Sequence, residues 1–473
     1  MATISRDSKQ TGRKTALRNG GAAPVYVNLT DKAFLRLHHG YGLPVITQTL
    51  TFVERRLSDA QLNAMYTLLK AGPLTRRVRR PAVPFARARW VPTDSALPLS
   101  VESDPIPDAD AMAWANRQAQ FPLDPDAGYG WRLSAVPTSS GGMIVCLSKS
   151  HAVADGHAGL MAEAGLVDPE RATKGALATA VGFRDELADG MHRATTIAKQ
   201  AFSEMRRANQ DPLHRKAVVT ALTTREPKTA QGSAEWQEQS AVLTFDAAQW
   251  RAIAARDGGT ANTLYLALTA DLLRNCPLID GIPPVLTPAV RILREHNQSD
   301  ANSFTRVPVV VQRDWLDNHD LTALRAASKG AFAAADTVGG GVLSRPRKMP
   351  PDLIDFLPEG VVHRLLETPP ITIGMCSNMG VLDDFIAPEL RESTPLLHMK
   401  RAVVQGLDLP TAVKQPVALA TWLSEAGERI HWNLESLKPE MSRSATELAN
   451  QATKVAASWG LHPLRIDTSD SGA

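Results

Sequence analysis

The sequence predicts an α+β protein with a mixed or antiparallel sheet in each of two lobes. A chain of 473 residues is too long for one small core and fits two domains of about 200 residues each. Strand and helix patterns are mixed along the chain, without the strict strand–helix alternation that builds a parallel sheet. The hydrophobic content of 44% and the charged content of 21% are ordinary for a folded globular protein.

The first half of the chain contains strands and a helix with clear start and stop signals. Val45–Val53 alternates apolar and polar residues, which is a strand pattern. Ser58 is placed to cap a helix that Gly72 ends. Two further strands, Trp131–Val136 and Met143–Ser148, flank a Ser- and Gly-rich loop of the kind that closes a hairpin.

The second half repeats this mixture after an Ala-rich, charged stretch at Val167–Arg225, whose composition predicts a helical linker or lid. Asp246 and Thr260 are placed to cap two helices, and a final helix is expected over Pro439–Trp459. The triple glycine Gly339–Gly341 lacks a following Gly-Lys-Ser/Thr, which indicates a loop and not a phosphate-binding site. The expected strands are Pro284–Val290, Arg306–Val311, Thr372–Cys376, Pro416–Leu423 and Arg429–Leu434.

These patterns divide the chain into five expected segments. They are a disordered lead over residues 1–23, an N-terminal lobe over 24–185, a helical linker over 186–235, a C-terminal lobe over 236–465 and a tail over 466–473.

The charge balance gives no sign of a nucleic-acid partner. The formal net charge is only +3, and the strongest basic cluster lacks the series of interleaved aromatic residues that base stacking uses. That cluster fits a solvated helix end and strand edge, or else a surface for phosphate groups, an acidic protein or an anionic membrane. It comprises Arg76, Arg77, Arg79, Arg80, Arg87 and Arg89.

No membrane span, metal site or disulfide framework is expected. The chain has no run of about 18 apolar residues, and its basic start lacks the apolar stretch of a secretory signal, although it is compatible with a transit peptide. Cys146, Cys276 and Cys376 are few, far apart and flanked by apolar residues, which predicts buried free thiols and a cytoplasmic location. The tandem His38–His39 precedes a Gly-containing loop and is expected to be solvated, not metal-bound.

The segment that carries chemistry is Leu147–Gly156, which reads LSKSHAVADG. It places the imidazole of His151 at the end of an apolar strand, and loops at strand ends on a rigid sheet commonly hold catalytic groups. Asp155 can form hydrogen bonds within the loop, and Gly156 permits a backbone angle that other residues resist. We therefore take His151 as the candidate catalytic residue, with a histidine that merely ends a strand as the plain alternative.

A hydrolase triad of Ser150, His151 and Asp155 is disfavoured. No Gly-x-Ser-x-Gly motif occurs in the chain, and adjacent residues rarely orient correctly for serine–histidine catalysis.

The same segment resembles the His-His-x-x-x-Asp-Gly motif of the condensation-domain-like acyltransferases. This superfamily includes wax ester synthases/diacylglycerol acyltransferases, polyketide-associated acyltransferases and the condensation domains of nonribosomal peptide synthetases. His151 matches the second, catalytic histidine, Asp155 and Gly156 match the end of the motif, and Ser150 replaces the first histidine. Weaker likenesses extend over about residues 28–460. They are Leu29–Leu35, Phe121–Asp124 with Trp131, Thr287–Arg291 followed by Asn302, and Ser377–Gly380.

The resemblance implies two chloramphenicol-acetyltransferase-like lobes that form a V-shaped pseudo-dimer with an active-site tunnel between them. It implies that His151 is the general base for acyl transfer from a thioester, without a covalent intermediate, to a hydroxyl group more readily than to an amine. Asp155 would pair with Arg291, with Arg294 in reserve, and would hold the loop. The candidate substrate-binding or oxyanion groups are the backbone near Gly156 and the side chains of Ser377, Asn378 and Ser150.

By the same resemblance, acyl-CoA or a phosphopantetheine thioester is a co-substrate, and no cofactor or metal is bound. The expected partners are a small-molecule donor and acceptor, with an acyl or peptidyl carrier protein and a peripheral membrane contact as further candidates for a monomer. Two alternatives stay open. The first is an amide-forming, free-standing condensation enzyme. The second is an inactive module that binds carrier proteins, and the replacement of the first motif histidine by Ser150 is the observation that supports it.

Overall fold

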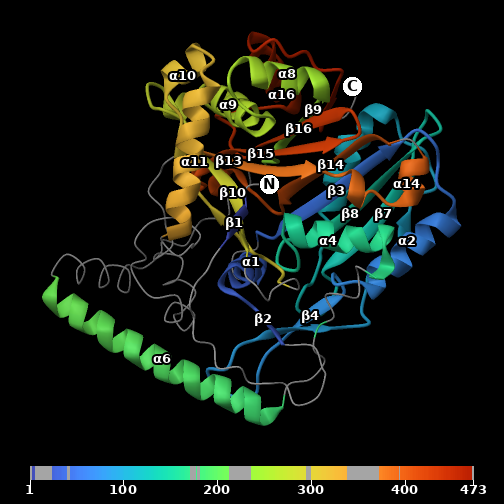
Figure 1. The fold of residues 1–473 in the computed structure, drawn as a ribbon. Coiled ribbons are helices and arrows are strands. Elements are labelled where there is room, and N and C mark those ends of the chain that lie inside the picture. Colours follow the sequence, from blue (N-terminus) through green and yellow to red (C-terminus); the bar gives the residue numbers. More distant parts are fainter. Residues whose placement is uncertain are drawn as a thin grey trace.

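The computed structural model describes residues 3–5, 24–39, 43–170, 177, 182–211, 236–293, 300–337, 372–393 and 395–470. Within these ranges, two large sheets and one small sheet form the framework. Both large sheets are mixed and are covered by helices, so the predicted α+β class is confirmed (Figure 1).

The larger sheet of the described chain has nine strands, most of them from the C-terminal half. Parallel pairs join β10 to β13 and β13 to β15, and antiparallel pairs join the following strands. The order is β1 (Thr3–Ser5), β10 (Val285–Leu293), β13 (Ile373–Val381), β15 (Val417–Ala426), β16 (Arg429–Ser436), β9 (Gln239–Asp246) and β17 (Arg465–Thr468), and β11 (Phe304–Arg306) and β12 (Val309–Val310) both pair with β10.

The second large sheet in the described ranges has five strands. Its central strand β8 ends at Ser150, so the Leu147–Gly156 segment comprises the C-terminal end of this strand and the turn that follows it. The strand order is β14 (Pro395–Val404), β3 (Val45–Val53), β8 (Met143–Ser150), β7 (Trp131–Pro137) and β6 (Ser100–Val101). The small sheet consists of β2 (Val25–Tyr26), β5 (Arg89–Pro92) and β4 (Arg76–Arg79).

The helices are distributed around these sheets, and α8, α9 and α16 lie together on one face of the larger sheet (Figure 1). The helices of the N-terminal half are α1 (Leu29–His39), α2 (Asp59–Ala71), α3 (Ala111–Ala119), α4 (Gly156–Val167) and α6 (Phe183–Gln210). Those of the C-terminal half are α8 (Ala247–Arg256), α9 (Ala261–Leu273), α10 (Arg313–Asp317), α11 (Leu321–Thr337), α14 (Pro388–Glu392), α15 (Leu409–Lys414) and α16 (Ala445–Ser458).

Local capping and alternation predicted several of these elements correctly. Val45–Val53 is β3, and Ser58 caps α2 with a reciprocal hydrogen-bonded pair to Gln61 before Gly72 ends the helix. Asp246 and Thr260 cap α8 and α9 by accepting hydrogen bonds from backbone N–H groups three residues on. These elements are predictable because their signals lie within a few residues of one another.

Other boundaries differ from the predictions. The expected strand Arg306–Val311 is broken into β11 and β12, because Pro308 has no N–H group to continue the ladder. The last helix begins at Ala445, where Ser444 caps it, and not at Pro439. Within the expected disordered lead, Thr3–Ser5 forms β1, since the edge strand β10 offers unpaired backbone groups. Gly339–Gly341 and Arg294 lie outside the described residues.

Strand β14 departs furthest from the expected division into lobes. It comes from the C-terminal half of the chain, yet it pairs antiparallel with β3 over almost its whole length, with Lys400 opposite Thr49. Orange β14 therefore lies beside blue β3 in Figure 1. At the chain's end, the expected tail begins inside β17, which pairs with β9. A boundary drawn along the sequence does not coincide with the boundary between the two sheets.

The basic cluster is not a single exposed patch. Arg76 and Arg89 are buried, whereas Arg87 and Arg89 form ion pairs with Asp189 and Glu186 of α6. Through these pairs the 28-residue α6 attaches to the small sheet, and Figure 1 shows the helix at the edge of the molecule.

The three cysteines are buried and free, as predicted. His38 and His39 end α1, and His39 Nε2 lies 2.8 Å from an Asp126 carboxylate oxygen. The described residues contain no group of side chains that would hold a metal ion. Among the helices in the described ranges, none combines the length and the apolar character that a membrane crossing requires.

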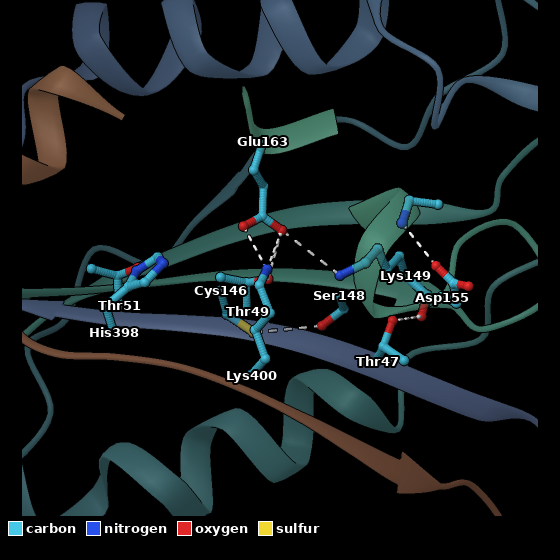
Figure 2. Close-up of polar contacts among 11 residues, drawn as sticks. Thr47, Thr49, Thr51, Cys146, Ser148, Lys149, Asp155, Glu163, His398 and Lys400 are labelled. Atoms are coloured by element: carbon cyan, nitrogen blue, oxygen red, sulfur yellow. Dashed lines mark hydrogen bonds and ion pairs between the residues drawn. The ribbon is translucent and has the colours of Figure 1, made fainter. Parts of the chain in front are cut away.

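A buried ion cluster ties α4 to the five-stranded sheet (Figure 2). The Nζ of Lys400 lies 2.8 and 2.6 Å from the two carboxylate oxygens of Glu163 and also donates to the Thr49 hydroxyl. Lys149 Nζ approaches the same carboxylate from β8, at 3.9 Å. The two ammonium groups lower the pKa of Glu163 against the opposing effect of burial.

We predict that Glu163→Gln destabilises the protein by about 3–5 kcal/mol, because it leaves two buried ammonium groups without a carboxylate. Urea unfolding followed by circular dichroism measures this loss. Glu54→Gln, at an exposed position, is the matched control and is expected to change the free energy of unfolding by less than about 0.5 kcal/mol. Equal stability of the two variants would contradict the assignment.

Candidate active site

The His151 loop is a short turn between β8 and α4. Its backbone is held at both ends: His151 N–H donates to Val45 O at 2.8 Å, and Asp155 caps α4 by accepting from Ala158 N–H at 2.8 Å. The second Asp155 oxygen accepts from Ser303 N–H at 2.8 Å, across the junction with the other sheet. One carboxylate therefore begins the helix and joins the two halves of the chain.

The imidazole of His151 contacts Asn302, which belongs to the segment before β11. His151 Nδ1 lies 3.0 Å from Asn302 Oδ1. The amide nitrogen of Asn302 donates to Asp31 Oδ1 at 2.9 Å and to the carbonyl oxygens of His151 and Ala152 at 3.0 and 3.3 Å. Asn302 is buried, so this network is shielded from bulk water.

This network fixes the tautomer of His151. The carbonyl groups can only accept hydrogen bonds, so the NH₂ group of Asn302 must face them and its oxygen must face the imidazole. Because that oxygen is an acceptor, His151 Nδ1 must carry the proton. The lone pair of the neutral ring is then on Nε2, where it is available to accept a proton.

Asp31 anchors the far end of the network. Its buried carboxylate accepts hydrogen bonds from Trp90 Nε1 and Asn28 N–H, both at 3.0 Å, as well as from Asn302. Burial raises the pKa of Asp31 to about 7, against these donors and the nearby Arg76 charge, which lower it. Three N–H donors around one carboxyl group are best satisfied by its ionised form.

Aromatic packing sets the plane of the imidazole. The Phe34 ring stacks on His151 with centroids 3.8 Å apart and an interplanar angle of 13°, and Phe304 lies 5.8 Å away at 48°. Burial lowers the pKa of His151 to about 4, and the charges of Arg306 and Lys149 lower it further. The ring is consequently neutral at physiological pH, as a general base must be.

His151 opens onto a cavity lined by residues of both sheets. Its volume is about 60 Å³, enough for roughly four to six water molecules. The lining residues are Thr47, Gln48, Lys149, His151, Asp155, Gly156, His157, Ala289, Phe304, Arg306, Ser377, Asn378, Met379, Lys400, Arg401 and Trp422.

The three side chains predicted as oxyanion candidates differ in their location and in their hydrogen bonds. Ser377 and Asn378 line the cavity, but they lie within β13 and not in a turn after it. The Asn378 side chain is engaged with Asn262 and Gly380 N–H, whereas no hydrogen bond of the Ser377 hydroxyl is found within the described residues. Ser150, by contrast, is buried, is not among the cavity-lining residues and accepts a hydrogen bond from Ala152 N–H.

Two supporting roles also differ from expectation. Asp155 and Arg291 are close enough for each charge to affect the pKa of the other, but the described residues show no ion pair between them. Backbone N–H groups hold the Asp155 carboxylate instead. Gly156 does not adopt a left-handed backbone. A Cβ at this position would lie 2.7 Å from the Met379 methyl group, so the glycine leaves room for that side chain.

Sequence reasoning missed several groups that face the cavity or orient His151. The sequence analysis included Asn302 in a family likeness but gave it no function, and it treated Phe34 only as part of the Leu29–Leu35 likeness. Lys149 and Arg306 were not singled out. Lys149 did carry a signal, since a lysine in an apolar strand two residues before His151 must share its face of the sheet.

His157 is the second histidine of the cavity, in the first turn of α4. Burial and the Arg291 charge lower its pKa to about 4 as well. No hydrogen bond fixes its ring within the described residues, so its geometry is not that of an oriented base.

Solved structures with this arrangement of sheets are condensation domains and related proteins. The first condensation domain of the calcium-dependent antibiotic synthetase, in complex with a substrate analogue, matches with a TM-score of 0.56 and 14% identity, over 96% of this chain and 100% of that one. Polyketide synthase associated protein 5 from Mycobacterium tuberculosis matches with a TM-score of 0.51 and 13% identity, over 92% and 98%. The chain thus has the condensation-domain fold, with the pseudo-dimeric arrangement of two lobes that the sequence predicted.

No protein-family model matches the sequence, and no curated protein sequence matches it.

We predict that the His151 imidazole titrates at about pH 4 and that Nδ1 carries the proton above that pH. Nitrogen-15 chemical shifts of histidine-labelled protein report both properties, and His151→Ala assigns the resonances. In Asn302→Ala the preference for the Nδ1–H tautomer is expected to be lost. A free-solution titration near 6.5, or a proton on Nε2 in the unaltered protein, would contradict the network.

Proposed function

We propose that the protein is an acyltransferase that moves an acyl group from a thioester to a hydroxyl group, with His151 as the general base. The observation that carries the proposal is the orientation of His151: Asn302 holds Nδ1, and Nε2 is left with its lone pair beside a cavity. The condensation-domain fold supports the reaction class, because such domains transfer acyl groups held as thioesters.

The chemistry needs one proton acceptor and no covalent acyl-enzyme. Nε2 of His151 takes the proton from the acceptor hydroxyl as its oxygen attacks the thioester carbonyl. The carbon–sulfur bond then breaks, and the proton passes to the departing thiolate, which leaves as a thiol. Binding both reactants at one base removes much of the association entropy from the chemical step.

The negative charge that develops on the carbonyl oxygen needs a donor. The Ser377 hydroxyl meets this need best among the predicted groups, because it lines the cavity and has no other hydrogen-bond partner within the described residues. Asn378 is occupied by neighbouring groups, and Ser150 is not at the cavity.

The charges of the cavity favour a hydroxyl acceptor over an amine. Four cationic side chains line it against one carboxylate, Asp155. Adding Glu163 and Glu435, which pair with Lys400 and Arg401, still leaves four cations against three carboxylates. An amine acceptor arrives mainly as an ammonium ion, which this environment repels. A neutral hydroxyl meets no such barrier.

The thioester is either an acyl-CoA or a carrier-bound phosphopantetheine thioester. Both present the same reacting group at the end of the same flexible arm. We therefore propose the thioester as the donor class, with a carrier protein as a candidate partner.

We predict that His151→Ala lowers kcat/KM for acyl transfer by about 10²–10⁴-fold, because it removes the proton acceptor. Purified protein is assayed with acyl-CoAs of several chain lengths and small alcohols, with free thiol as the readout. His462→Ala, at an exposed position, serves as the control with normal activity. Full turnover by a folded His151→Ala protein would contradict the proposal. A wild-type protein that binds a carrier protein but transfers no acyl group would favour an inactive binding module.

A second prediction concerns pH. Only the neutral imidazole accepts a proton, so activity is lost as pH falls through the folded-state pKa of His151, about 4. We expect the acid limb that belongs to His151 to lie near pH 4 and not near 6.5, measured in the range where circular dichroism shows an intact fold. An acid limb near 6.5 that His151→Ala abolishes would contradict the burial of this imidazole.

A further inference from the structure

The cavity beside His151 contains cationic groups that lack full carboxylate partners. Arg401 has a carboxylate partner, because it pairs with Glu435 at 3.2 Å, and it also donates to Gln48, although its Nη2 atom has no hydrogen-bond partner within the described residues. Lys400 is satisfied by Glu163. Lys149 and Arg306 differ from these two, and they approach the cavity from different sheets.

Arg306 ends β11 and lines the cavity without an ionic partner in the described part of the chain. Its Nη1 atom is buried and has no hydrogen-bond partner. The guanidinium lies 5.6 Å from the centre of the Phe304 ring, which neutralises no charge. Burial lowers the pKa of Arg306 to about 10, so the group stays cationic at physiological pH.

Lys149 is only weakly paired. Figure 2 shows the Glu163 carboxylate facing both lysines, with Lys400 at hydrogen-bond distance, whereas Lys149 Nζ remains 3.9 Å away. Burial and the Lys400 charge lower the pKa of Lys149 to about 8, which leaves it mostly protonated near neutral pH. One carboxylate is shared by two ammonium groups, so a positive charge remains uncompensated at the cavity.

Strand β8 and helix α4 together fix the position of the Lys149 side chain. Lys149 is the penultimate residue of β8, His151 directly follows the strand, and both side chains line the same cavity. Helix α4 passes over this lysine at Gly159, where a Cβ would lie only 2.6 Å from Lys149 Cε. Glycine at this point leaves the room that the buried lysine side chain occupies.

Buried cations are normally paired, because removal from water is costly for a charge without a counter-ion. Two under-paired cations facing one cavity indicate that the missing anion arrives with the substrate. The cavity of about 60 Å³ fits a small group of this kind. The phosphates of CoA or of a carrier arm cannot supply it, since the whole pantetheine chain separates them from the thioester at His151.

We propose that this cavity recognises a substrate that carries a carboxylate close to its reacting group, with Lys149 and Arg306 as the recognising residues. This inference rests on the proposed acyl transfer at His151 and narrows its substrate class. The carboxylate belongs either to the acceptor, as in a hydroxy acid, or to the acyl chain, as in the half-thioester of a dicarboxylic acid. His151 remains the proposed general base, and Ser377 remains the proposed oxyanion donor.

The test compares matched substrates that differ only in charge. One arm pairs hydroxy acids with their methyl esters as acceptors, using a fixed neutral acyl-CoA. The other arm pairs dicarboxylic half-thioesters of CoA with monocarboxylic acyl-CoAs of equal length, using a fixed neutral alcohol. We expect the charged member of one arm to be preferred by tenfold or more in kcat/KM, mainly through a lower KM.

Lys149→Met and Arg306→Met test which groups produce the preference. Each is expected to reduce it by about tenfold, as loss of a charge-assisted hydrogen bond would, and the readout is the ratio of kcat/KM for the charged and the neutral substrate within one variant. Lys70→Met, at an exposed position on α2, is the matched control and should keep the preference. Arg306→Gln replaces Arg306→Met if the latter does not fold.

The outcomes separate this inference from the proposed function. Transfer that depends on His151 but shows no charge preference in either arm overturns the carboxylate site and leaves the acyltransferase standing. A preference that persists in both Lys149→Met and Arg306→Met overturns the assigned residues. If no thioester is turned over, thermal stabilisation by succinate decides: stabilisation of the wild type but not of the two variants supports the site, and equal behaviour of all three overturns it.

Discussion

The active-site geometry depends on the side-chain amide of Asn302. Its oxygen faces His151 Nδ1, while its nitrogen is held by Asp31 and by the carbonyl oxygens of His151 and Ala152. Both ends of the amide are engaged, so it cannot rotate without losing several buried hydrogen bonds. The consequence is a defined tautomer of the imidazole, whose neutral state comes from burial and whose plane is set by the stacked Phe34 ring. The amide reaches His151 from the segment before β11, so the catalytic orientation exists only when the two halves of the chain are docked.

The same docking concentrates positive charge around the base. Strand β14 crosses from the C-terminal half of the chain into the five-stranded sheet and brings Lys400 and Arg401 to the cavity. Two carboxylates, Glu163 and Glu435, pair with these two groups, whereas Arg306 has no ionic partner within the described residues. The fold thereby combines a base that is kept neutral by burial with an electrostatic environment that suits anions and repels ammonium ions. Burial accounts mainly for the first property, with smaller contributions from the Arg306 and Lys149 charges, and the cations account for the second.

The parts of this arrangement that the sequence predicted are those with local signals. Alternation in Val45–Val53, the caps at Ser58 and Asp246, and the strand that delivers His151 all depend on residues within one element. The partners of β14 and the role of Asn302 depend on contacts between residues about 150 to 350 positions apart, for which one sequence carries no direct signal. Ser150 is absent from the cavity lining for a simpler reason, because it follows Lys149 in β8 and strand alternation turns it to the opposite face.

The central claim is that Asn302 acts through His151, and a double-mutant cycle on kcat/KM for thioester-dependent acyl transfer tests it most directly. The four proteins are the wild type, the two single alanine variants at positions 151 and 302, and the double variant. If the amide serves only to orient the imidazole, its removal costs activity when His151 is present and costs nothing further when His151 is already absent. Additive losses in the double variant, in proteins with matched folding, would contradict the account and give Asn302 a separate role.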